Sequence, residues 1–228
     1  MRVLLTGFPD TNKKAKKTLE HYSGVALDFP LQKMKIIDGS IKLLGKSDWV
    51  IFTSPAAVRL YMQHLYPLNH FIKAACVGPA TAGALEEDYG RACSLVPAKN
   101  YSAKALAEEI INNLSLFRAK KILFPCSRLA KDDLMRELSE VGLDVTRHNF
   151  YEPEQSQAGV LPHFDAVCFF SSSAVEAYFS LSDPADLALK KVSLIGESTA
   201  ITFRQYSNAD FLVANQPSAE EAVKVLFS

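Results

Sequence analysis

The stretch from Asp48 to Tyr61 reads DWVIFTSPAAVRLY and predicts a buried strand that runs directly into a helix. The apolar run from Val50 to Phe52 is typical of a strand inside a parallel sheet. Ser54 follows where the N-cap of a helix belongs. Pro55 would take the first helical position, where its missing N–H costs nothing. We therefore expect one strand–helix unit of an α/β fold here.

The same pattern returns in the second half of the chain. Residues 165–178 read DAVCFFSSSAVEAY, with Asp, Val, Phe, Ser, Ala, Val and Tyr where the first copy has them. Three further pairs of segments match at nearly the same spacing: Gly78–Ala82 with Gly196–Ala200, Ser102-Ala103 with Ser218-Ala219, and Arg2–Leu5 with Lys121–Phe124. Alternating strands and helices favour parallel sheets covered on both faces. The repeat predicts two similar doubly wound parallel-sheet domains.

The remaining segments complete this expected pattern. We predict strands over residues 2–6 and 25–29, a helix over 10–23, an extended segment over 31–37 and a short helix around Gly39–Leu44. The extended segments near Pro30 and Tyr151–Pro153 lie at similar distances from the start of a repeat. We therefore expect both to cross between the domains, side by side.

Composition limits the classes of function. Lysine plus arginine and aspartate plus glutamate number 25 each, so the formal net charge is zero and does not favour nucleic acid or anionic membranes. We expect neither a signal peptide nor a membrane span, because no apolar run approaches ~18 residues. Four widely spaced cysteines are expected to be reduced and mostly buried, as in a cytoplasmic protein: Cys76, Cys93, Cys126 and Cys168.

The chemistry is expected where strands end and helices begin. Hydroxyl side chains and free backbone N–H groups gather there, in the loops Thr53-Ser54, Gly78–Thr81, Ser171-Ser172 and Gly196–Thr199. Such loops suit a carboxylate or a phosphate, although helix capping alone also explains their serines and threonines. We find no motif for a nucleophilic serine or cysteine, for zinc, for a dinucleotide or for a phosphate loop. These loops therefore suit a polyanion that reacts largely by its own chemistry.

The chain resembles the uroporphyrinogen-III synthase family. Six segments carry the resemblance, in order and over nearly the whole chain: Phe52–Val58, Val77–Ala82, Leu123–Cys126, Phe150-Tyr151, Phe169–Ser171 and Ile195–Ala200. The resemblance implies two α/β domains joined by a two-stranded linker, with the active site in the cleft between them. It places domain 1 at residues 1–30 plus 154–228, domain 2 at 33–149, and the linker strands near 30–33 and 149–153.

The resemblance also implies a reaction. A cytoplasmic enzyme, classed as a hydro-lyase, would cyclise hydroxymethylbilane with loss of water and inversion of ring D. It would need no metal or cofactor. We expect a monomer that makes at most transient contact with the upstream bilane-forming enzyme. Two alternatives stay open: a non-catalytic two-domain ligand-binding or regulatory protein of the same fold, and a phosphate-handling α/β enzyme.

The resemblance finally implies roles for individual residues. Tyr151 matches the family's tyrosine, which is proposed to help the substrate hydroxyl leave. The residues expected to bind substrate are Thr53, Ser54, Gly78, Thr81, Ser171, Ser172, Ser198 and Thr199. Glu197 departs from the pattern, because the first copy has Pro79 there. Candidate cations just past predicted strands are Lys99, Arg128 and Arg147, and each is equally explained as a solvated surface charge.

Overall fold

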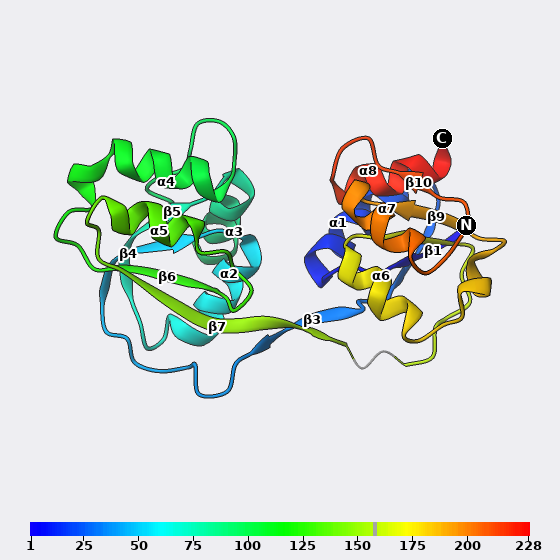
Figure 1. The fold of residues 1–228 in the computed structure, drawn as a ribbon, viewed down its shortest axis with the longest axis horizontal. Coiled ribbons are helices and arrows are strands. Elements are labelled where there is room, and N and C mark those ends of the chain that lie inside the picture. Colours follow the sequence, from blue (N-terminus) through cyan, green and yellow to red (C-terminus); the bar gives the residue numbers. More distant parts are fainter. Residues whose placement is uncertain (157–158) are drawn as a thin grey trace. The chain divides into compact units, whose positions relative to one another are not determined.

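A computed structural model describes residues 1–156 and 159–228 (Figure 1). The chain divides into two compact units. The first unit combines Met1–Met34 with Pro153–Ser228, and the second is Lys35–Glu152. The chain passes from the first unit to the second within strand β3 (Gln32–Ile36) and returns within strand β7 (Val145–Gln155). These two strands are neighbours in one sheet, as expected for the two crossing segments.

The first unit contains a five-stranded sheet with parallel pairing throughout. Its order is β10 (Leu212–Val213), β9 (Lys191–Leu194), β8 (Ala166–Phe169), β1 (Arg2–Leu5) and β2 (Val25–Asp28). Its helices are α1 (Pro9–His21), α6 (Ser172–Phe179), α7 (Glu197–Arg204) and α8 (Ala219–Lys224). Val3 and Leu5 pack in a core with α1 and α8, whereas Leu4 packs in another core with α6 and α7. Alternate side chains of β1 thus fill opposite faces of a sheet covered on both sides.

The second unit repeats this plan. Its sheet has the order β3, β7, β6 (Ile122–Ser127), β4 (Ser47–Phe52) and β5 (Phe71–Cys76). Its helices are α2 (Pro55–Leu60), α3 (Pro79–Tyr89), α4 (Ala103–Asn112) and α5 (Asp133–Glu140). Trp49 and Ile51 share a core with buried side chains of α4 and α5. Phe52 instead meets Tyr61, which follows α2, with the ring centroids 5.4 Å apart.

Short helical turns complete the chain at Tyr61–Leu65, Leu114–Leu116, Pro184–Leu187 and Val225–Phe227. No helix within the described ranges has both the length and the apolar character needed to cross a membrane.

The predicted repeat is confirmed by the strand order. The first sheet runs β2, β1, β8, β9, β10, and the second runs β7, β6, β4, β5. In the second unit, Leu95 pairs with Ala75 of β5 through a parallel bridge. This bridge lies where β10 pairs with β9 in the first unit. The matched segments Arg2–Leu5 and Lys121–Phe124 correspond to β1 and β6, so each sequence repeat occupies the same place in its sheet.

The short helix expected around Gly39–Leu44 is wrong. Gly39 and Gly45 adopt left-handed backbone angles, with φ of 71° and 79°, and the chain between them is irregular. Residues distant in the sequence bind backbone carbonyls of this segment, which in a helix would accept hydrogen bonds from the helix itself. The Ser40 carbonyl binds Nε2 of His148 at 2.8 Å, and the amide of Asn69 donates to the Lys42 carbonyl at 2.8 Å. These distant partners override the local helical preference.

All four cysteines are free, and Cys76, Cys126 and Cys168 are buried. Burial raises the pKa of Cys168 from 9.0 to about 12, and that of Cys126 to about 11. A thiol whose pKa is higher in the folded state stabilises that state fully below the unfolded pKa, and the contribution is lost as the pH rises towards the folded pKa.

We therefore expect the free energy of unfolding to fall as the pH rises above about 9, by up to ~1.4 kcal/mol per pH unit for Cys168 alone. Urea unfolding between pH 7 and 10.5 measures this slope. The substitution Cys168→Ala should make the slope shallower, whatever it does to the stability at pH 7. An equal slope in the wild type and in Cys168→Ala would contradict a raised pKa of Cys168 in the folded state.

Candidate functional site

In the second unit, the predicted site residues follow the neighbouring strands β4 and β5. Ser54 caps helix α2, because its Oγ accepts a hydrogen bond from the Ala57 N–H at 3.1 Å. Gly78 is the N-cap of α3, with extended backbone at φ −178°. Thr81 lies in the first turn of α3 with its side chain 2% exposed. The site in this unit therefore offers one accessible hydroxyl pair, Thr53 and Ser54, beside the start of a second helix.

Tyr151 is brought to Ser54 by the sheet. It lies in β7 with 5% of its surface exposed, and its ring meets Phe150 edge-on at 4.9 Å. Burial raises the pKa of the Tyr151 phenol, while hydrogen bonds with the Ser54 side chain and the Ser127 backbone act in the opposite direction. The net effect keeps the phenol protonated at neutral pH. Tyr151 is thus a neutral hydrogen-bond donor adjacent to the β4–α2 loop.

In the first unit, the corresponding loops are joined to each other. Ser171 caps α6 by accepting from the Ala174 N–H at 3.1 Å. The Ser172 hydroxyl donates to the Ser198 carbonyl at 3.1 Å and so connects the starts of α6 and α7. Ser198 is exposed, whereas Thr199 is only 1% exposed. Ser171, Ser172 and Ser198 therefore form one polar cluster at the carboxyl end of β8 and β9.

Helix capping uses one lone pair of the Ser54 and Ser171 hydroxyls. Ser171 Oγ also lies 3.2 Å from the Ser173 hydroxyl, which itself donates to Gln32 Oε1, so Ser54 keeps more bonding capacity than Ser171. A serine oxygen that accepts a backbone N–H keeps its own O–H as a donor. The first N–H groups of a helix have no partner within it and favour negative charge. Binding of carboxylates by the two loop sets stays a prediction.

Two of the candidate cations are already paired. Arg128 follows β6 and forms an ion pair with Glu152 at 3.2 Å. Arg147 lies inside β7, which corrects its expected position beyond a strand. Its guanidinium binds Asn149 Oδ1 and the Ala130 carbonyl, each at 2.8 Å, and pairs with Asp132. Lys99 is exposed in the loop that precedes α4.

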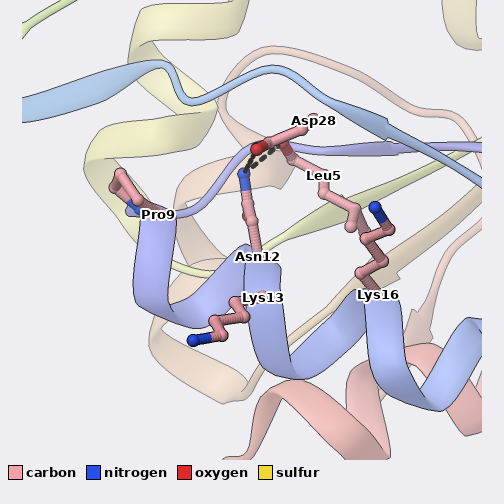
Figure 2. A pocket seen from close by; sticks show the side chains of 6 residues that line it. All are labelled: Leu5, Pro9, Asn12, Lys13, Lys16 and Asp28. Carbon is pink, nitrogen blue, oxygen red and sulfur yellow. Dashed lines mark hydrogen bonds between the residues drawn. The ribbon is translucent and has the colours of Figure 1, made fainter.

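Sequence reasoning missed a cavity of about 210 Å³ in the first unit (Figure 2). Its lining residues come from the carboxyl ends of β1 and β2 and from the first turns of α1: Leu5, Pro9, Asn12, Lys13, Lys16 and Asp28. Figure 2 shows the Asn12 amide directed at Asp28 and Leu5. The sequence indicates a basic helix face at Lys13, Lys14, Lys16 and Lys17, either as solvated surface or as an anion site, and two of these lysines, Lys13 and Lys16, line the cavity.

Asn12 organises the floor of this cavity. Its Nδ2 donates to the Leu5 carbonyl at 2.9 Å and to Asp28 Oδ1 at 2.6 Å, and its Oδ1 accepts from the Gly7 N–H at 2.9 Å. A Cβ at residue 7 would lie 2.9 Å from Asn12 Oδ1, so a glycine is needed at this close approach. One buried side chain thus ties β1, β2 and the β1–α1 loop together.

Across residues 1–156 and 159–228, no three His, Cys, Asp or Glu side chains gather in a way that would hold a metal ion.

Comparison with known proteins gives a consistent result. The sequence model of "Uroporphyrinogen-III synthase HemD" matches residues 13–224. The chloroplastic uroporphyrinogen-III synthase of Oryza sativa subsp. japonica is 26% identical over 223 residues, which cover 90% of this chain and 72% of the rice protein. The crystal structure of uroporphyrinogen-III synthetase from Helicobacter pylori 26695 superposes with a TM-score of 0.65 at 17% identity, covering 100% of this chain and 99% of that one. The structural match supports the fold, and the sequence match reaches nearly every element described above.

Proposed function

Because this chain belongs to the uroporphyrinogen-III synthase family, we propose that it cyclises hydroxymethylbilane to uroporphyrinogen III. The observation that carries this proposal is the family match over residues 13–224, which includes both units. Uroporphyrinogen-III synthases are enzymes of tetrapyrrole and heme biosynthesis. No observation favours the non-catalytic alternative or the phosphate-handling one.

We propose that the reaction is a cofactor-independent elimination of water, which makes the enzyme a hydro-lyase. The substrate hydroxyl leaves as water after it receives a proton. Tyr151 would assist, because a protonated phenol donates a hydrogen bond or a proton to a leaving oxygen. The influence of the Ser54 side chain on the pKa of Tyr151 supports this role, because Ser54 belongs to the loop that would hold the substrate. Loss of the hydroxyl leaves an electrophilic methylene on ring A, and the substituted α-carbon of ring D bonds to it to give a spiro intermediate. The bond from that carbon to the ring C–ring D bridge then breaks, the bridge bonds to the other α-carbon of ring D, and loss of a proton restores the pyrrole of the closed, inverted macrocycle.

We propose that substrate carboxylates are bound by the loop hydroxyls and helix N-termini of both units. In the second unit these groups belong to Thr53, Ser54 and the Gly78–Thr81 segment. In the first unit they belong to Ser171, Ser172 and the Ser198-Thr199 segment. Thr81 and Thr199 are buried, and their backbone N–H groups bond to the Gly78 and Gly196 carbonyls, so their segments would contribute mainly the positive ends of α3 and α7. Lys13 and Lys16 would add positive charge at the cavity of the first unit.

We propose domains at residues 1–30 plus 154–228 and at 33–149, joined by linker strands near 30–33 and 149–153. The neighbouring positions of β3 and β7 support this proposal. We propose a cytoplasmic monomer, in at most transient contact with the upstream bilane-forming enzyme; the free cysteines suit a reducing compartment.

A coupled assay tests the reaction. Hydroxymethylbilane is generated in situ, and the uroporphyrin I and III isomers are separated after oxidation. Without an active synthase the bilane closes by itself to the I isomer. We expect an excess of the III isomer that rises with added protein. Formation of the I isomer alone, with correctly folded protein, would refute the activity and favour the binding-protein alternative.

A further inference from the structure

Tyr101 lies directly on the glycine that begins helix α3. A Cβ built at Gly78 would be 2.8 Å from Tyr101 Cβ, 2.9 Å from Cγ and 3.2 Å from Cδ1, so the tyrosine side chain occupies the space beside this glycine. Tyr101 nevertheless keeps 58% of its surface exposed. An aromatic ring therefore stands at the edge of the proposed carboxylate-binding loop with much of its surface in solvent.

The backbone around Tyr101 is held on both sides. Asn100 adopts a left-handed φ of 56°, and its carbonyl accepts from the Ser102 N–H at 2.7 Å. Ser102 caps helix α4 through a 3.1 Å bond from the Ala105 N–H. A tight turn followed by a capped helix gives Tyr101 a defined position, so its placement on Gly78 does not depend on a flexible loop.

The internal repeat provides a comparison within the same molecule. In the first unit, Gly196 corresponds to Gly78 and begins α7 in the same way. Ser218 corresponds to Ser102, with the same 2.7 Å bond from its N–H to the carbonyl two residues earlier and the same capping bond at 3.1 Å. Pro217 stands where the second unit has Tyr101, and a Cβ at Gly196 would meet nothing within 4 Å. The first unit therefore forms the same strand, glycine and helix start without an aromatic side chain beside the glycine. The fold does not require an aromatic residue at position 101.

We propose that Tyr101 contacts the substrate directly, by stacking its ring on one pyrrole ring while the neighbouring loop holds that ring's carboxylates. This inference rests on the proposed function, which supplies a ligand with flat, electron-rich rings and many carboxylates. A half-exposed tyrosine beside the positive end of helix α3 matches both properties, because its face is apolar and its hydroxyl remains hydrated. Stacking of this kind on an aromatic side chain typically changes affinity about tenfold or more when the ring is removed.

The test compares variants by their affinity for uroporphyrin III, measured by fluorescence, and by KM and kcat in the coupled assay. Tyr101→Ala and Tyr101→Leu remove the aromatic face, and Tyr101→Leu keeps apolar bulk over Gly78. Tyr101→Phe keeps the face and removes only the hydroxyl. Leu189→Ala is the matched control for loss of an exposed apolar side chain, because Leu189 is 100% exposed. We expect Kd and KM to rise about tenfold in Tyr101→Ala and Tyr101→Leu and less than about threefold in the other two.

Gly78→Ala tests the contact by a second route, since the added methyl must displace the Tyr101 side chain. Gly83→Ala is its control in the same helix, because a Cβ there meets only Glu87 Oε1 at 3.5 Å. We expect Gly78→Ala to weaken binding in the wild-type background and to add little in the Tyr101→Gly background, since the Cβ and the ring that the methyl would meet are then both gone. Additive effects would show that the methyl acts independently of Tyr101 and would count against the proposal.

The outcomes separate this proposal from the proposed function. If the wild type forms the III isomer and Tyr101→Leu, still folded, binds and turns over like the wild type, stacking by Tyr101 is refuted and the activity stands. If the wild type forms only the I isomer but binds uroporphyrin III in a Tyr101-dependent manner, the activity is refuted and the ligand contact stands.

Discussion

Tyr151→Phe is expected to lower kcat for formation of the III isomer by about a hundredfold, while KM changes by less than about threefold. The phenol is nearly buried, stays protonated because burial raises its pKa, and bonds to Ser54 at the start of α2. Removing its hydroxyl removes the proton donor to the leaving group but preserves the ring that packs on Phe150. The separated isomers in the coupled assay report the loss directly.

A matched control comes from the first unit. Tyr178 is also a buried tyrosine whose pKa is raised by burial, and its hydroxyl accepts a 3.4 Å hydrogen bond from Ser182. Tyr178→Phe should retain nearly full turnover, with at most ~1 kcal/mol lost in stability. Full activity in Tyr151→Phe would show that the hydroxyl does not assist the elimination and would leave the family assignment untouched.

The raised pKa of Tyr151 also predicts the form of the pH profile. The donor is active while it is protonated, so its contribution should persist to pH values above the ordinary phenol value of 10.0 and decline only beyond it. Between pH 7 and 9, the turnover of the wild type should therefore fall no more than the turnover of Tyr151→Phe. An alkaline decline below pH 9 that is absent from the variant would mean that the phenol is more acidic than its surroundings indicate.

The parts of the fold that are encoded locally could be predicted from the sequence. The apolar run 50–52 followed by Ser54-Pro55 describes a strand, a cap and a first helical turn within a few residues, and the structure has each of them. The second copy of this stretch also has a serine cap at the start of its helix. Ser102 and Ser218 cap the helices α4 and α8 in the same way. Because the repeats keep their order, the arrangement of neighbouring strands follows from them as well.

Features that depend on distant partners could not be predicted in this way. The segment 39–44 has helix-compatible residues, but Asn69 and His148 bind its backbone from elsewhere in the chain. The contact of Tyr151 with Ser54 needs the sheet order, and that of Tyr101 with Gly78 needs the path of the loop before α4. Composition cannot show such proximity, since it arises from the pairing of strands far apart in sequence.

Asn12→Asp is expected to lower the free energy of unfolding by about 3–4 kcal/mol at pH 7, the largest stability effect of a single isosteric change that we predict. The buried amide donates to the Leu5 carbonyl and to the Asp28 carboxylate (Figure 2). A carboxylate in its place can still accept the Gly7 N–H at one oxygen. The oxygen that replaces Nδ2 would face the Leu5 carbonyl without a proton to donate, and it adds a like charge beside Asp28. Urea unfolding gives the free energy, and Asn215→Asp provides the same chemical change at an exposed position.

Asn12 lies next to the lysine-rich stretch of α1, whose sequence is typical of a solvated helix. The Asn12 side chain is nevertheless buried, and both polar atoms of its amide are hydrogen-bonded. If the like charge causes the damage, adding Asp28→Asn to Asn12→Asp should recover about half of the lost free energy, because a donor then lies between the two side chains again. Lowering the pH should also help, since burial and the neighbouring Asp28 carboxylate would raise the pKa of a carboxyl at residue 12, which is then protonated first. A deficit that neither change reduces would mean that the lost donation to the Leu5 carbonyl dominates. Asn12→Ala, which removes that donation without adding a charge, would then be at least as destabilising as Asn12→Asp.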